Sequence, residues 1–416
     1  MTGSPPGPKP DGARRVFVHI GSPKSGTTFI QQVLWNNRQA LDAEGVLLPT
    51  GGRVRQHAAV WDLRGVPQHP DDPAPSRAGA WDRLAEQVRE SRHPVAVVSE
   101  ESLASLPPKR IARAVASLAP AEVHVVYTMR DLAGLLPSAW QEFVKHRSPK
   151  QYDAWLQDVI DGGPTVGAGR WFWSVHDAVA VLERWSRDLP KERVHVITVP
   201  PPGSPRDLLW RRFADVIGVD PDVAVLDGAF ANESLGMAET ELLRRVSLAM
   251  PEDVPKWMFG QVVKGVLAHQ VLSRRDGKRK FSVPEDRRAW VLQRQRTLVE
   301  GLRAAGYRVS GDLDDLLRPP TWHDPTPPGD REMLQSATDG LVGLLQEIVS
   351  LREENSALRR ELAEQQGRPL HKTVVHHVSE RNPVVMRMRV AYWHAKERIR
   401  GPEPAGDVQG GAGNGR

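Results

Sequence analysis

The chain has 416 residues, a length that allows one large or two ordinary domains. It contains 56 Lys and Arg against 51 Asp and Glu, and 40% of its residues are hydrophobic, so the composition is that of a globular protein without a general basic field. The absence of cysteine excludes disulfides, thiolate metal sites and cysteine nucleophiles. Since no apolar run approaches the roughly 20 residues of a membrane span and residues 1–15 lack the apolar stretch of a secretory signal, we expect a cytoplasmic protein.

The first 318 residues contain two contrasting regions. Residues 1–14 are rich in Pro and Gly and are expected to be a disordered lead-in. Between residues 15 and 318, Val- and Ile-rich runs typical of buried parallel strands are followed by longer stretches of helical spacing. The clearest strand runs are Val16–Ile20, Val95–Val98, Val123–Met129 and Val194–Val199. This alternation predicts an α/β domain over residues 15–318, with a parallel sheet flanked by helices in three layers.

A proline-rich linker at residues 319–330 precedes a different pattern over residues 331–366. Two series of positions there repeat every seven residues, as in a coiled coil: Leu334, Leu341, Ile348, Asn355 and Leu362, and midway between them Ala337, Leu344, Leu351 and Leu358. Glu347 precedes Arg352 by five residues, the spacing that pairs charges across a parallel dimer. We predict a homodimer through this coiled coil. The alternative is an amphipathic helix packed on its own domain, and Gly340 and Gly343 weaken the first part of the coil.

Residues 367–400 form a basic tail, since the segment from Arg368 to Arg400 holds eight Lys or Arg and two Glu. With Tyr392 and Trp393 among the charges, this tail could contact an anionic membrane surface. A solvated helix or a partner-binding segment has the same composition. Residues 401–416 have the composition of disordered sequence.

The most informative segment is the glycine-rich turn after the first strand run, which reads Gly21-Ser22-Pro23-Lys24-Ser25-Gly26-Thr27-Thr28. A strand, a glycine turn and a helix in direct succession aim backbone N–H groups and a helix N-terminus at an anion. The turn departs from the Walker A pattern, because Thr27 and not a lysine follows the second glycine. No strand run ends in an Asp suited to hold Mg²⁺, so nucleotide hydrolysis and kinase chemistry are disfavoured.

This turn resembles the 5′-phosphosulfate-binding loop of sulfotransferases that use 3′-phosphoadenylyl sulfate (PAPS). The resemblance implies a P-loop-type fold, PAPS as the co-substrate and no metal. It assigns nucleotide binding to Pro23, Lys24, Ser25, Gly26, Thr27 and Thr28. Lys24 would also be catalytic, by neutralising the leaving phosphate oxygen.

A second anion site is predicted at Arg130, which ends the Val123–Met129 run, and Ser138, eight residues later. An arginine fork and a hydroxyl suit a phosphate, and in sulfotransferases this pair binds the 3′-phosphate. A late basic loop, Gly277-Lys278-Arg279, is similar to the segment that covers the 3′-phosphate and adenine in that family, although the residue order differs. The alternative for this loop is a plain solvated turn. No aromatic platform accompanies it, so we expect no nucleic-acid partner.

Two residues are candidates for the base that takes the acceptor's proton. Glu100 follows the Val95–Val98 run, at the sheet edge where ligands bind in open α/β folds. It matches the catalytic Glu of heparan-type carbohydrate sulfotransferases, although Glu101 replaces the lysine that follows it in that family. His176 is the rival, because imidazole is a natural base near neutral pH and cytosolic sulfotransferases use a histidine. On a helix, Asp177 would point away from this histidine.

These motifs predict an enzyme that moves a sulfuryl group from PAPS to a hydroxyl, or an amine, of a carbohydrate, a lipid or another small-molecule acceptor. Acceptor pockets in such folds are built from variable loops, so the sequence does not identify the acceptor. Two alternatives stay open: a P-loop nucleotide kinase or NTPase, and a non-catalytic dimeric nucleotide-binding protein.

Overall fold

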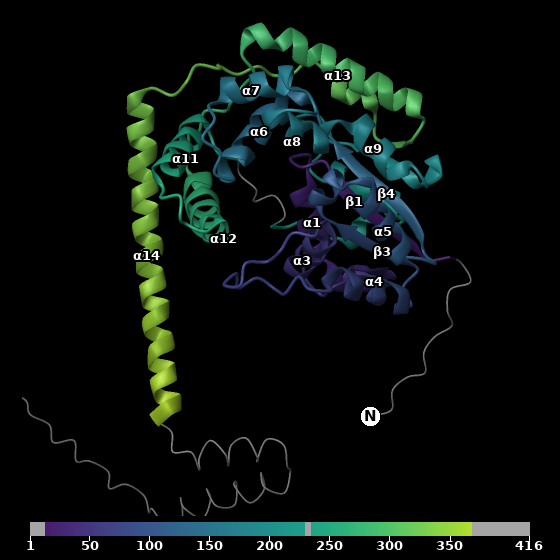
Figure 1. Ribbon diagram of the computed structural model, residues 1–416, viewed down its shortest axis with the longest axis horizontal. Coiled ribbons are helices and arrows are strands. Elements are labelled where there is room, and N and C mark those ends of the chain that lie inside the picture. Colours follow the sequence, from purple (N-terminus) through teal and green to yellow (C-terminus); the bar gives the residue numbers. More distant parts are fainter. Residues whose placement is uncertain (1–12, 229–233, 368–416) are drawn as a thin grey trace, which may run out of the picture. The chain divides into compact units, whose positions relative to one another are not determined.

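One parallel sheet organises the chain (Figure 1). The computed structural model describes residues 13–228 and 234–367, so the segments predicted as basic tail and disordered end lie outside the described residues, as does nearly all of the lead-in. Six strands pair in the order β2-β3-β1-β4-β5-β6. Their bounds are β1 Arg15–Gly21, β2 Val46–Leu47, β3 Val95–Ser99, β4 Glu122–Met129, β5 Val194–Thr198 and β6 Arg308–Ser310. The predicted α/β class, with a parallel sheet flanked by helices, is confirmed.

The order in which the chain adds strands to the sheet reverses at β1. This strand pairs in parallel with β3, where Val16 lies opposite Ala96, and with β4, where Val16 lies opposite Val123. Every residue of β3 and of β5 is buried, as expected for strands covered on both faces. Since the chain leads from β1 to strands on either side of it, the carboxyl end of β1 is a switch point, where open α/β sheets bind ligands.

Helices connect the strands and cover both faces of the sheet. Before β5 they are α1 Thr27–Asn36, α2 Arg38–Ala43, α3 Arg53–Arg64, α4 Ala80–Glu90, α5 Pro108–Ser117, α6 Leu132–Lys145, α7 Tyr152–Asp161, α8 Gly167–His176 and α9 Ala178–Ser186. After β5 they are α10 Leu208–Ile217, α11 Met237–Ala249, α12 Lys256–Phe259, α13 Glu285–Ala305 and α14 Asp330–Gly367. Other helical segments are the 3₁₀ helices η1 Glu101–Ser105 and η5 Leu272–Arg274 and the π-helix η4 Gly260–Val271.

Two apolar cores lie on the two faces of the sheet. On one face, Ile30 of α1 and Trp210 and Phe213 of α10 pack with Phe17 of β1. The larger core on the other face holds helices α3 to α9, α11 and α13. Its largest fully buried side chains are Trp81, Trp140, Trp155 and Trp185. They come from α4, α6, α7 and α9, and α6 follows directly on β4, where the predicted site residue Arg130 lies (Figure 1).

The described chain divides into two compact units within α14, between Leu344 and Leu345. In the first unit, Met333 and Ser336 of α14 are buried. Within the described ranges, no helix combines the length and the apolar character needed to cross a bilayer.

Candidate active site

The loop between β1 and α1 has a backbone conformation that favours glycine at two positions. Gly21 and Gly26 have φ values of 104° and 79°, in the left-handed region. A Cβ at Gly26 would come within 2.3 Å of Leu209 Cδ2, so a side chain there would clash with α10. Lys24 also has a positive φ, of 62°, and lies between these glycines. No side chain caps α1, so its first N–H groups remain available to an anion.

Hydrogen bonds fix this loop against β4. The Ser22 amide donates to the Thr128 carbonyl at 2.8 Å, and the Ser22 and Ser25 hydroxyls lie 2.8 Å apart. Ser25 and Thr27 are buried. These bonds hold the loop that carries Lys24 against the carboxyl end of β4.

Lys24 is paired with a carboxylate that sequence analysis did not single out. Its ammonium lies 2.6 Å from Glu142 Oε2, on α6. Lys264 of η4 approaches the other oxygen at 2.5 Å, and Lys145 lies 3.9 Å from Oε2. His146 Nε2 is 3.1 Å from Oε1. One carboxylate is thus shared by three lysines.

This cluster shifts the pKa values of its members. Burial alone would raise the pKa of the Glu142 carboxyl, but the charges of Lys24 and Lys264 and the His146 hydrogen bond hold it well below the ordinary 4.5. Burial, together with the charge of Lys24, lowers the pKa of Lys145 to about 8. The cluster carries excess positive charge, which is the electrostatic condition for binding an anion.

Arg130 and Ser138 lie beside the same loop. The Arg130 guanidinium follows β4 and donates to the carbonyl oxygen of Lys24 at 3.4 Å. It also covers Gly134, since a Cβ on that glycine would come within 2.4 Å of Arg130 Nη2. The Ser138 hydroxyl donates to the Gly134 carbonyl at 3.0 Å. Both predicted 3′-phosphate residues therefore lie against Gly134, in the first turn of α6, and Arg130 also contacts the loop.

Glu100 lies at the end of β3, on the other side of β1. Its amide donates to the His19 carbonyl at 3.0 Å, and its carboxylate lies 3.1 Å from Nδ1 of His57, on α3. Burial would raise the pKa of Glu100, but the hydrogen bond and the charge of His57 lower it below 4.5. Burial and the neighbouring Glu100 charge raise the pKa of Glu101, whose carboxylate accepts from Gln31 Nε2 at 2.9 Å. The surroundings thus move the pKa values of two adjacent carboxyls in opposite directions, a pattern that is typical of acid–base sites.

His176 ends α8 in an apolar setting. Its ring centroid lies 4.6 Å from that of Phe172, and neither ring nitrogen has a hydrogen-bond partner in the described chain. Burial, reinforced by the nearby charge of Lys24, lowers its pKa to about 3, so the imidazole is neutral at pH 7. Asp177 turns away, because it caps α9 and pairs with Arg294 at 2.9 Å.

The basic loop Gly277-Lys278-Arg279 has protein partners of its own. Arg279 pairs with Glu332 of α14 at 3.1 Å and with Asp324 at 3.4 Å, and its carbonyl accepts from the Met237 amide at 2.9 Å. The Lys278 ammonium donates to the Ser273 carbonyl. None of the contacts described for these residues involves the loop around Lys24. The described contacts of Arg279 thus connect this loop to α11, to the linker and to α14.

Sequence reasoning missed Glu142, Lys145, Lys264 and His57. Glu142 carried a usable signal, because it comes four residues after Ser138 and so lies on the same helix face. Lys264 carried none, since 122 residues separate it from Glu142. In residues 13–228 and 234–367, no group of three or more His, Cys, Asp or Glu lies close enough to hold a metal ion.

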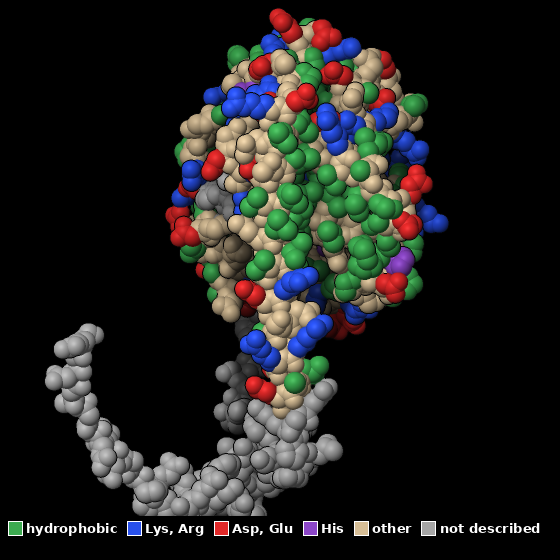
Figure 2. Space-filling view, turned by 90° about the vertical axis from the view of Figure 1, so that its left-hand side faces the viewer, with side chains coloured by type: hydrophobic (Ala, Val, Ile, Leu, Met, Phe, Trp, Pro, Cys, Tyr) green, Lys and Arg blue, Asp and Glu red, His purple; other side chains and the backbone are tan. Residues whose placement is uncertain are grey.

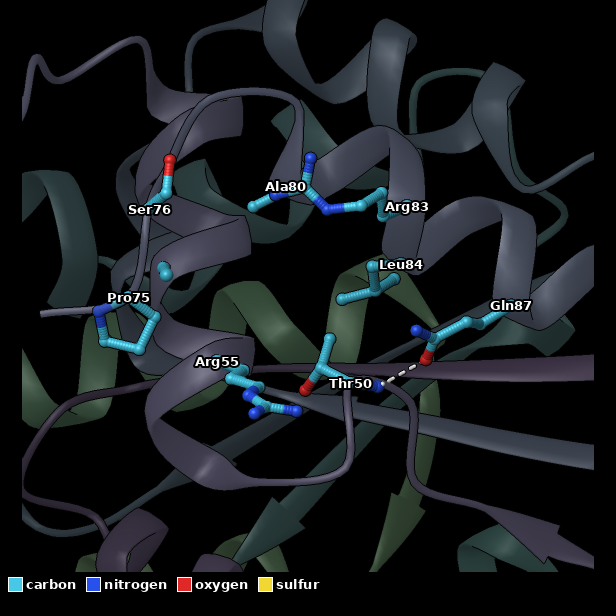
Figure 3. Close-up of a pocket in the computed structure, with 9 residues that line it drawn as sticks. Thr50, Arg55, Pro75, Ser76, Ala80, Arg83, Leu84 and Gln87 are labelled. Carbon is cyan, nitrogen blue, oxygen red and sulfur yellow. Dashed lines mark hydrogen bonds between the residues drawn. The ribbon is translucent and has the colours of Figure 1, made fainter. Parts of the chain in front are cut away.

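A hollow of about 310 Å³ lies between α3 and α4 (Figure 3). Arg55, Ser76 and Arg83 line it, and the Thr50 amide donates to Gln87 Oε1 at 2.7 Å across its floor. None of its lining residues takes part in the contacts around Lys24 or Glu100 described above. This hollow is a separate feature of the α3–α4 surface.

Comparisons with known proteins do not assign the chain to a family. No protein-family model matches the chain, and no curated protein matches it. Among solved structures, it is similar to the crystal structure of a sulfotransferase from Alicyclobacillus acidocaldarius, with 14% sequence identity and a TM-score of 0.34. The similarity covers 57% of this chain and 94% of that chain. A functional conclusion therefore has to come from the geometry of the loop, β4 and α6.

Proposed function

We propose that this protein is a PAPS-dependent sulfotransferase. The observation that carries the proposal is the contact between Arg130 and the Lys24 carbonyl, which makes the two predicted anion-binding elements neighbours. PAPS has a phosphosulfate at one end of its ribose and a phosphate on the 3′ position, so one molecule can contact the loop and Arg130 together. The acceptor is a hydroxyl, or an amine, of a carbohydrate, a lipid or another small metabolite.

In the proposed reaction, the acceptor oxygen attacks sulfur while the bridging bond from sulfur to the 5′-phosphate oxygen breaks. The electron pair of the broken bond stays on the phosphate, and the acceptor's proton passes to a protein base. The products are a sulfate ester and adenosine 3′,5′-bisphosphate. Lys24 and the backbone N–H groups of the loop would balance the negative charge that develops on the leaving oxygen.

Glu100 is the proposed base and His57 its positioning residue. The low pKa of Glu100 keeps the carboxylate ionised, and the bond to His57 fixes its orientation. His176 remains the rival, since it is neutral and close enough to Lys24 for that charge to affect its pKa. It is buried among aromatic rings, and neither of its ring nitrogens has a hydrogen-bond partner in the described chain.

Binding of adenosine 3′,5′-bisphosphate in EDTA is the first test, measured by calorimetry beside ATP with Mg²⁺. We expect the bisphosphate to bind more tightly. Tighter binding of ATP with Mg²⁺ would favour a kinase or NTPase. In a second step, ³⁵S-labelled PAPS and fractionated host extract should give a labelled acceptor. Bisphosphate binding without any labelled product would favour a non-catalytic nucleotide-binding protein.

Replacing Arg130 with alanine should weaken binding of adenosine 3′,5′-bisphosphate roughly 30-fold, because a charge-assisted bond to phosphate is lost. Adenosine 5′-monophosphate, which lacks the 3′-phosphate, should bind the variant and the wild-type protein about equally. Arg113→Ala is the control, since that arginine pairs with Asp82 on the surface. Equal weakening for both nucleotides would remove Arg130 from the 3′-phosphate site.

Glu142 is proposed to be the counter-anion of Lys24 in the nucleotide-free protein. A bound phosphosulfate has to share or displace this carboxylate, which lies 2.6 Å from the Lys24 ammonium. Glu142→Gln should therefore raise the affinity for adenosine 3′,5′-bisphosphate about tenfold. Glu241→Gln is the matched control, because Glu241 pairs with Arg244 and Arg245 on α11.

The same variant should also change the pH dependence of stability. A depressed carboxyl pKa stabilises the fold above the ordinary value of 4.5, and this contribution is lost as the pH falls through the lower folded value. The free energy of unfolding should be lower for Glu142→Gln than for the wild-type protein at pH 6. The difference should shrink as the pH falls below 4.5. A difference that is independent of pH, with unchanged bisphosphate affinity, would contradict the counter-anion role.

A further inference from the structure

The first part of α14 is docked on its own domain. Gly340 lies against Leu272, where an added Cβ would be 3.2 Å from Leu272 Cδ2, and a Cβ on Gly343 would come within 2.3 Å of Val271 Cγ1. Asp339 pairs with Arg275 at 2.8 Å. These glycines let the helix approach η4 and η5 closely, which accounts for glycine at two positions of a helix that it would otherwise weaken.

Leu344 is still partly buried against the domain core, but the apolar positions of the repeat that follow it are exposed. Figure 2 shows hydrophobic side chains gathered over much of the face that it presents. Four core positions of the repeat are about half exposed: Ile348 by 48%, Leu351 by 53%, Leu358 by 57% and Leu362 by 54%. A regular apolar stripe of this kind on a soluble helix marks a surface that another element covers.

We propose that residues 345–362 pair with the same segment of a second copy of this chain in a parallel, two-stranded coiled coil. Leucine occupies the second core series at Leu351 and Leu358, which favours two strands. Asn355, in the first series, would face its own equivalent and hydrogen-bond to it. A buried asparagine at this position fixes both the register and the two-stranded state.

Charges flanking the stripe select a parallel arrangement. The positions before Ile348, Asn355 and Leu362 are all glutamate (Glu347, Glu354 and Glu361), and the positions after Leu351 and Leu358 are Arg352 and Arg359. In a parallel pair Glu347 and Glu354 face Arg352 and Arg359 of the other chain, whereas an antiparallel pair places Glu beside Glu and Arg beside Arg. Glu347, Glu354, Arg352 and Arg359 form no ion pair within the described part of the chain, so they are available to a second copy.

The oligomeric state of the full chain tests the proposal. Light scattering during size exclusion should give twice the 46.2 kDa chain mass. Combining Leu351→Glu with Leu358→Glu should weaken association at least about 100-fold and give monomers at micromolar concentration. Val349→Glu is the matched control, since Val349 is 55% exposed but lies off the stripe. A monomeric wild-type chain, or a dimer that survives the double substitution, would overturn the proposal.

Orientation is tested by cross-linking, which is simple because the chain has no cysteine. Leu362→Cys should form an intermolecular disulfide on mild oxidation, because equivalent core positions meet in a parallel, in-register pair. Val349→Cys should not. A dimer in which Leu362→Cys fails to cross-link would exclude the parallel register. All of these readouts are independent of nucleotide binding, so they stand or fail separately from the proposed enzymatic activity.

Discussion

Replacing Lys24 with methionine is expected to lower sulfuryl transfer about 1000-fold, because the leaving phosphate oxygen loses the cation that would neutralise it. The structure supports a transition-state role for this side chain. A positive φ in the loop displays Lys24 beside Arg130, and the ammonium already holds a carboxylate at 2.6 Å. The measurement is the rate of release of adenosine 3′,5′-bisphosphate from PAPS in the presence of an acceptor fraction, beside calorimetric binding of the bisphosphate.

Lys264→Met provides the matched control. Both lysines contact Glu142, at 2.6 and 2.5 Å, and their side chains are 30% and 29% exposed. Only Lys24 lies in the loop, so the Lys264 variant should lose less than about tenfold in rate. Similar losses in the two variants would mean that the charge of the cluster matters and that Lys24 has no special position. An unchanged rate for Lys24→Met would remove the catalytic assignment.

The fold could be predicted because the strands of this sheet are buried on both faces. Runs such as Val95–Val98 have to be apolar throughout, whereas apolar residues in the helices between them recur about every 3.6 residues. Strands and helices can therefore be told apart along the sequence. The glycine turn after β1 was visible for the same local reason, since Gly21 and Gly26 supply conformations and space that other residues do not. The α/β fold class predicted from these local signals is confirmed.

The environment of the site could be predicted only in part, since most of it depends on distant segments. Arg130 and Ser138 were visible from their spacing after a strand. The ion pair between Lys24 and Glu142 was not, because it joins residues that lie far apart in the sequence. Sequence spacing also could not reveal that Arg279, predicted to bind nucleotide, pairs with Glu332 some 53 residues later. Long-range ion pairs of this kind are set by tertiary packing and leave no local signal.

Replacing Glu100 with glutamine is the second substitution for which we expect a loss of about 1000-fold in turnover, since an amide cannot accept the acceptor's proton. Binding of adenosine 3′,5′-bisphosphate should change little, because the carboxylate contacts His57 and lies on the other side of β1 from Arg130. The depressed pKa of Glu100 predicts that the wild-type rate holds to below pH 4.5 before this carboxylate is protonated. The low residual rate of the Glu100→Gln variant should not show this fall at acidic pH.

Glu101→Gln separates this role from a general effect of removing a buried carboxyl. The Glu101 carboxylate accepts a hydrogen bond from Gln31 Nε2 at 2.9 Å and is not the proposed base, so the substitution should cost little activity. His176→Phe completes the comparison, because phenylalanine fits the aromatic setting around Phe172 and removes both ring nitrogens. If His176→Phe abolishes transfer while Glu100→Gln retains it, the imidazole is the base. A large loss in Glu100→Gln with activity kept in both other variants leaves Glu100 as the group that takes the proton, with His57 holding it in place.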